Sequence, residues 1–228
     1  MKIRVSINGP FIVQGDIPLF KELIICGSDG NPTNWELAGE YPHQGTCALC
    51  RCGRSANMPF CDGSHEKAGF EGTETASKQP YFESADFIDG RGIGLHDVES
   101  LCAQAKFCHR GGNIWELAAT RTDPGSIGIV IADANDCPSG RLVARDRESG
   151  EVIEPELRPS ISVVEIPAAK NSGPLWVKGR IPIESSSGTL YEVRNRVTLC
   201  RCGKSRNMPF CDGNHVSAGF NDGDESLR

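Results

Sequence analysis

The sequence contains no long hydrophobic run. Only 38% of its 228 residues are hydrophobic, and no stretch approaches the roughly 20 apolar residues of a membrane-spanning helix. The N-terminal stretch MKIRVSINGPFIVQGD also lacks the uninterrupted apolar core of a signal peptide. We therefore expect a soluble, cytoplasmic protein that has no membrane partner.

Basic clusters and common catalytic motifs are missing as well. Lys and Arg number 24 against 30 Asp and Glu, and no dense basic run occurs, so we expect no nucleic-acid partner. The sequence has no GxGxxG, GxxxxGK[ST] or GxSxG stretch. We expect no catalytic residues, and we expect a protein that is not an enzyme.

Glycine, proline and cysteine are abundant. The 26 Gly and 14 Pro favour short strands and turns over long helices. Eleven cysteines without an export signal indicate metal or redox chemistry, because disulfides are rare in the cytosol. The odd number also argues against a fully paired disulfide framework.

A sixteen-residue segment occurs twice. CRCGRSANMPFCDGSH covers 50–65 and CRCGKSRNMPFCDGNH covers 200–215, with thirteen identical positions. A leader precedes each copy: 9–19 and 173–183 share six of eleven positions, and their apolar alternation predicts short strands. Leader and loop are separated by 30 residues in the first copy and 16 in the second, so we expect the extra 14, within 26–45, to form a polar loop.

Each copy has the spacing Cys-x-Cys-x8-Cys-x3-His, which can enclose one metal centre. A structural zinc site accepts Cys3His ligation, but zinc loops usually open with Cys-x2–4-Cys. A single intervening residue suits two sulfurs on one iron of a 2Fe-2S cluster, with the third Cys and the His on the other iron. A helix starting after the third Cys favours a nearby thiolate through its N-terminal N–H groups.

The duplicated loop resembles the CDGSH-type iron–sulfur motif, including Ser55/Ser205, Pro59/Pro209 and the CDG-x-H ending. The resemblance implies two 2Fe-2S clusters. Their implied ligands are Cys50, Cys52, Cys61 and His65 in the first copy, and Cys200, Cys202, Cys211 and His215 in the second. Cys47 is excluded because its counterpart is Val197, and Cys26 is also a spare thiol.

The region between the repeats is different. The apolar spacing of 96–108 predicts an amphipathic helix, 126–140 a second apolar segment, and 141–146 and 161–167 strands. Cys102, Cys108 and Cys137 resemble the ligands of divergent single-cluster ferredoxins of the 4Fe-4S class, except that Ala105 occupies the middle position. Three thiolates suit a 3Fe-4S cluster. A 4Fe-4S cluster with His96 or His109 as fourth ligand and the absence of any cluster are the alternatives.

These features predict an α+β protein with β-rich CDGSH modules at 1–79 and 166–228 and a ferredoxin-like domain at 80–165, followed by a disordered tail. We expect a multi-cluster electron carrier whose partners are redox proteins. Cluster storage or delivery to an apo-acceptor, redox or pH sensing, and a role as an oxidoreductase subunit are the alternatives. The tandem repeat predicts a monomer with an internal pseudo-two-fold.

A histidine ligand predicts acid-sensitive clusters. Cluster loss should accelerate as the pH falls toward the range where free imidazole protonates, about 6.5 and lower. The double substitution His65→Cys and His215→Cys should slow this loss, followed by visible absorption across a pH series. Unchanged acid lability in the double variant would contradict the assignment of the two histidines.

Overall fold

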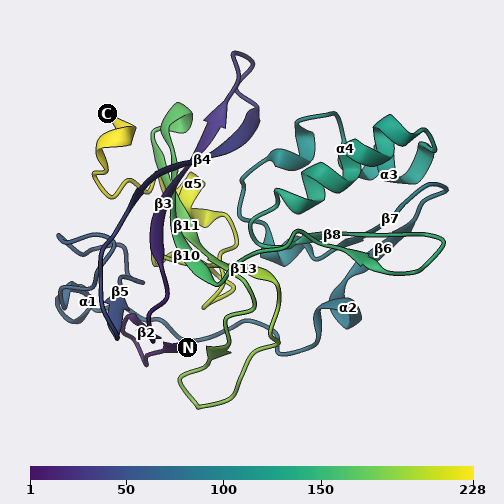
Figure 1. The fold of residues 1–228 in the computed structure, drawn as a ribbon. Coiled ribbons are helices and arrows are strands. Elements are labelled where there is room, and N and C mark those ends of the chain that lie inside the picture. Colours follow the sequence, from purple (N-terminus) through teal and green to yellow (C-terminus); the bar gives the residue numbers. More distant parts are fainter.

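The computed structural model describes all 228 residues, which form a mixed α+β structure with three sheets and five short helices (Figure 1). The duplicated segments form two sheets. The first has the strand order β12 (Ile183–Glu184), β1 (Lys2–Val5), β2 (Phe11–Gln14), β5 (Cys47–Leu49). The second has the order β13 (Arg196–Leu199), β11 (Asn171–Lys178), β10 (Ser160–Ile166), β3 (Leu19–Cys26), β4 (Pro32–Glu40).

The two halves of the chain exchange one strand. β1 and β2 pair antiparallel in the first half, as β10 and β11 do in the second. β3 follows β2 in the chain but runs parallel to β10, with Leu19 opposite Ile161. β12 follows β11 but runs parallel to β1, with Ile183 opposite Ile3. Each half therefore completes the sheet of the other.

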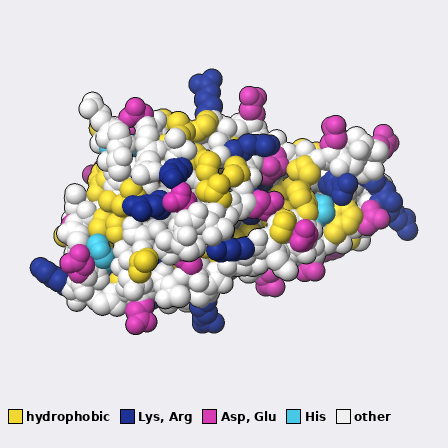
Figure 2. Space-filling view, turned by 90° about the horizontal axis from the view of Figure 1, so that it is seen from below, with side chains coloured by type: hydrophobic (Ala, Val, Ile, Leu, Met, Phe, Trp, Pro, Cys, Tyr) yellow, Lys and Arg dark blue, Asp and Glu magenta, His cyan; other side chains and the backbone are white.

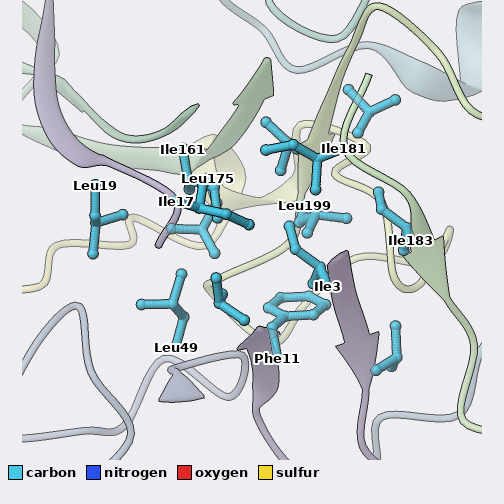
Figure 3. Packing of buried hydrophobic residues seen from close by; sticks show 14 of the residues in the cluster. Ile3, Phe11, Ile17, Leu19, Leu49, Ile161, Leu175, Ile181, Ile183 and Leu199 are labelled. Atoms are coloured by element: carbon cyan, nitrogen blue, oxygen red, sulfur yellow. The ribbon is translucent and has the colours of Figure 1, made fainter. Parts of the chain in front are cut away.

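One hydrophobic core lies between these two sheets. Its 17 buried residues come from both halves of the chain, and Figure 3 shows side chains of β1, β2, β3, β10 and β11 gathered in one cluster. Alternate residues of β2 are buried, as the apolar alternation predicts. Because neither half encloses a core alone, the duplicated segments form a single folded unit.

The central region forms a third sheet with the order β6 (Asp86–Asp89), β7 (Gly94–Asp97), β8 (Leu142–Arg145), β9 (Val152–Ile153). Helices α3 (Ile114–Thr120) and α4 (Pro124–Asn135) cover one face of it (Figure 1). Asn113 and Asp123 cap these helices through their side chains. The remaining helices are α1 (Ser64–Lys67), α2 (Tyr81–Ser84) and α5 (Asn214–Ser217). None of the five helices combines the length and the hydrophobicity that a membrane-spanning helix requires.

The predicted helix over 96–108 is wrong. Residues up to Asp97 lie in β7, which pairs with β6 and β8, and two short 3-10 turns follow at Glu99–Leu101 and Phe107–His109. Gln104 and Lys106 have positive φ angles of 55° and 63°, which a helix excludes. The apolar residues that suggested a helix instead belong to a strand and to the irregular loop that follows it.

Two further expectations are corrected. The extra segment within 26–45 contains strand β4, which forms a β-hairpin with β3, and its polar composition reflects the exposure of this edge strand. The C-terminal tail is ordered, because Lys21 forms an ion pair with Asp224 and Leu227 is buried. The apolar segment after residue 126 is in α4, and the two strands expected near 141–146 and 161–167 are confirmed as β8 and β10. Strand β10 lies in the second sheet and not in the central one.

The exchanged strands predict that a cut chain stays assembled. We would insert a site-specific protease sequence between Glu148 and Ser149, in the exposed turn between β8 and β9. After cleavage the two fragments should still elute together in size-exclusion chromatography, because β1–β12 and β3–β10 pair across the cut. Denaturant should separate them. Separation without denaturant would show that the halves fold independently.

Candidate metal centres

Each cysteine loop folds back onto the strand that precedes it. In the first loop the Cys50 N–H donates to the Pro59 carbonyl and the Cys61 N–H to the Ala48 carbonyl, each at 2.8 Å. The second loop repeats both bonds at 2.9 Å. The Asp62 carboxylate accepts hydrogen bonds from the N–H groups of Ala56 and Ser64, which lower its pKa. Asp62 therefore shapes the loop.

The four implied ligands of each loop lie in two pairs. Cys50 Sγ and Cys52 Sγ are 3.7 Å apart, and Cys61 Sγ lies 3.3 Å from His65 Nδ1. The corresponding distances in the second loop are 3.7 and 3.5 Å. Two donors on one tetrahedral metal, at about 2.0–2.3 Å each, are about 3.5–3.8 Å apart. Each pair thus has roughly the span of two ligands on one metal, and nowhere do three or more Cys, His, Asp or Glu side chains surround a single point.

The two loops differ in burial. Cys61 and His65 are partly exposed, whereas Cys211 and His215 are only 3% and 1% exposed. Burial, with the nearby Arg201 charge adding to it, lowers the pKa of His215 to about 4. Its Nε2 is buried without a hydrogen-bond partner, while its Nδ1 faces Cys211 Sγ.

The loops lie back to back. Gly53 and Gly203 follow the second cysteine of each motif and have φ angles of +72° and +73°. A Cβ on Gly53 would lie 2.8 Å from the Cys202 carbonyl oxygen, and one on Gly203 would lie 2.6 Å from that of Cys52. Both glycines are required by backbone conformation and by the close approach of the two loops.

The arginine between the paired cysteines is buried in both loops but is held differently. Arg201 forms ion pairs with Glu165, at 2.5 Å, and with Asp222. Arg51 has no ion-pair partner; it donates to the carbonyls of Ser6 and Gly72 and lies against the rings of Phe11 and Phe70. The same residue type is therefore neutralised by carboxylates in one half and solvated by carbonyls and aromatic faces in the other.

The three central cysteines lie around one pocket. Cys102, Cys108 and Cys137 line one pocket together with Ala105 and Arg141. Burial raises the pKa of Cys108 to about 12, and the charges of Cys137 and Cys102 add to it. Thiols of this kind are protonated at neutral pH, so binding of a metal must release protons.

Neither proposed histidine substitute lines this pocket. The His96 ring stacks on Phe87, 4.4 Å away, and the His109 ring packs 5.7 Å from Trp115. Cys47 lies in β5 opposite Val13, at the position that Val197 occupies opposite Val177 in the second half. It is thus outside the ligand pairs, as is Cys26 at the end of β3.

Several residues near the sites were not identified from the sequence. Gln104 Nε2 donates to Cys102 Sγ at 3.6 Å, and Ser139 Oγ lies 3.5 Å from Cys137 Sγ. Trp35 on the β3–β4 hairpin stacks on Phe107 beside the central cysteines. Only the three-dimensional path of the chain brings these residues together, although an isolated Trp in a polar segment is a signal that the hairpin packs against a neighbour.

Comparison with known families agrees with this geometry. Residues 8–66 and 172–216 match the family model described as iron-binding zinc finger CDGSH type, and residues 88–147 match the model described as divergent 4Fe-4S mono-cluster. A search of curated proteins finds no match.

The matched iron-binding and cluster-binding regions define an iron–sulfur protein. Two regions that match the CDGSH model flank a region that matches the divergent single-cluster model.

The back-to-back loops predict that Gly53→Ala and Gly203→Ala are both destabilising, by about 1–3 kcal/mol each, because a Cβ clashes with a carbonyl oxygen in a left-handed conformation. Thermal unfolding, with iron content measured in parallel, provides the test. Gly128→Ala in α4, where a Cβ meets nothing within 4 Å, is the control and should be neutral or stabilising. Unchanged stability of both loop variants would contradict the close approach.

Proposed function

We propose that each CDGSH loop holds a 2Fe-2S cluster, with Cys50 and Cys52 on one iron and Cys61 and His65 on the other. Cys200, Cys202, Cys211 and His215 take the same roles in the second loop. The observation that carries the proposal is the arrangement in two pairs, each with roughly the span of two ligands on one metal. A zinc-only loop would instead need all four donors around one ion.

When bound, such clusters supply one-electron oxidation and reduction. The chain's own residues would tune this chemistry. A neutral imidazole in place of a fourth thiolate removes one negative charge, which favours the reduced form relative to an all-cysteine site. Hydrogen bonds between each loop and β5 or β13 hold the backbone of the cysteines, and burial of Cys211 and His215 limits the access of water to the second site.

For the central region we propose a 3Fe-4S cluster on Cys102, Cys108 and Cys137. Three cysteines line the pocket, while Ala105 offers no donor and His96 and His109 lie outside it. Three thiolates match the three irons of this cluster type. A 4Fe-4S cluster would need a fourth ligand from outside the chain's pocket residues.

We propose that the protein is a monomeric carrier of electrons and not an enzyme. The exchange of β3 and β12 between the two halves of one chain supports a monomer, because two separate modules would have to exchange these strands between chains. Storage or delivery of clusters is the second candidate. The partial exposure of Cys61 and His65 favours it, because these ligands are open to solvent.

The proposal predicts about seven iron atoms and about eight acid-labile sulfides per chain. The oxidised protein should show an electron paramagnetic resonance signal from the central cluster, whereas oxidised 2Fe-2S clusters are silent. Cys137→Ala should abolish that signal and leave the visible absorption of the other clusters. Zinc without sulfide would refute all three assignments, and full sulfide with no signal in the oxidised protein would refute only the central one.

Cluster transfer separates the two candidate functions. The loaded protein would be mixed with an apo-ferredoxin, in the oxidised and in the reduced state, and cluster movement followed by absorption. An electron carrier should retain its clusters in both states. Rapid transfer in the oxidised state alone would favour a switchable cluster donor.

A further inference from the structure

The two ligand loops are nearly identical in sequence but have different surroundings. Cys211 and His215 are buried, whereas their counterparts Cys61 and His65 are partly exposed. In Figure 1, α1, which contains His65, lies on the side of the molecule away from the central sheet. The cause of the difference must lie in segments outside the loops.

Segment 102–106 of the central region covers the second loop. A Cβ on Gly213 would lie 3.0 Å from the Cys102 carbonyl oxygen and 2.5 Å from Gln104 Cγ, whereas a Cβ on the equivalent Gly63 meets nothing within 4 Å. Gly213 lies directly between Cys211 and His215 in the motif, and its N–H donates to Cys211 Sγ. The segment therefore packs against the residue that lies between the two ligands.

A side-chain hydrogen bond joins the same two regions. Asn207 Nδ2 donates to the Ser100 carbonyl at 3.1 Å. Asn57 occupies the equivalent position in the first loop, and its side chain donates to no other segment. The first loop thus has no counterpart of this bond to the central region.

Strand β11 provides a second cover. Asn171, which is 5% exposed, donates through Nδ2 to the His215 carbonyl at 3.2 Å and so fixes α5 to the sheet. The repeated leader places Ile7 at the equivalent position, two residues before Gly9, and Ile7 is 78% exposed. Helix α1 has no such bond to its sheet.

On this basis we propose that the two CDGSH sites have different tasks, an inference that rests on both of them binding clusters. At the first site, iron-binding donor groups from outside the protein, such as the thiolates of an acceptor protein, reach the bound iron. The second site is an internal centre, retained by segment 102–106 and Asn171. Contacts from the central region, which lies between the two repeats, therefore give two nearly identical motifs different degrees of burial.

Chelation kinetics test the inference on the intact, cluster-loaded protein. With an excess of 2,2′-bipyridyl, visible absorption should be lost from the two CDGSH sites in separate phases that differ at least tenfold in rate. His65→Cys should change only the faster phase, and His215→Cys only the slower. A phase that neither substitution changes belongs to the central cysteines.

The duplication supplies matched controls. Asn207→Ala should accelerate the slow phase, and Asn57→Ala should leave both phases unchanged. Asn171→Ala and Ile7→Ala form a second pair with the same expectation. Asn207→Ala and Asn171→Ala remove contacts from different segments, so if one of these variants fails to fold, the other still tests the inference.

Three results would overturn the inference: equal rates at the two sites, a faster phase assigned to His215, or equal responses within both matched pairs. Iron and sulfide are assayed before the chelator is added. Absence of sulfide would reject the cluster assignment itself. Full sulfide with equal rates would leave that assignment standing and reject only the division of tasks.

Discussion

The reciprocal pairing of β3 with β10 and of β12 with β1 is the constraint on which the rest of the structure depends. These parallel contacts place Leu19 and Ile183 in a core built from both halves of the chain. The same exchange sets the relative position of the two cysteine loops, because the first loop follows β5 in one sheet and the second follows β13 in the other. Gly53 and Gly203 then allow the backbones to touch. Strand exchange and loop contact are thus two consequences of one arrangement.

The central region packs against a segment that is longer in the first repeat than in the second. The first half extends its exchanged strand into the longer hairpin, and the added strand β4 carries Trp35 against Phe107 and Trp176. Arg110 also donates to the Thr33 carbonyl of this hairpin. These contacts hold the turn that contains Cys108, so the extra residues of the first repeat serve the site between the repeats. On its other side the same region covers the second cysteine loop.

The ligand loops could be predicted from sequence because their geometry is local. Sixteen residues contain all four donors, and hydrogen bonds within the loop and to the adjoining strand define its shape. The strand exchange could not be predicted, because alternation identifies a strand and its buried face but not its partner. The hairpin was not predicted because most residues of the edge strand β4 are exposed, so no regular alternation of buried and exposed residues marks it. The helix expected at 96–108 failed because tertiary pairing of β7 and two left-handed residues override an apolar periodicity.

The buried arginines show how nearly identical motifs acquire different properties. A buried guanidinium needs compensation, and the two halves provide it with different chemistry. Glu165 and Asp222 neutralise Arg201, although burial raises the pKa of Glu165 to about 7, whereas carbonyl oxygens and aromatic faces surround Arg51. Glu165 lies at the end of β10, in a part of the strand that extends beyond the length of its counterpart β1. The different surroundings of the two arginines therefore arise in part from the greater length of β10, while the Cys and His residues of the two motifs are the same. Duplication followed by change in the scaffold alone is sufficient to give one chain two distinct environments for the same set of ligands.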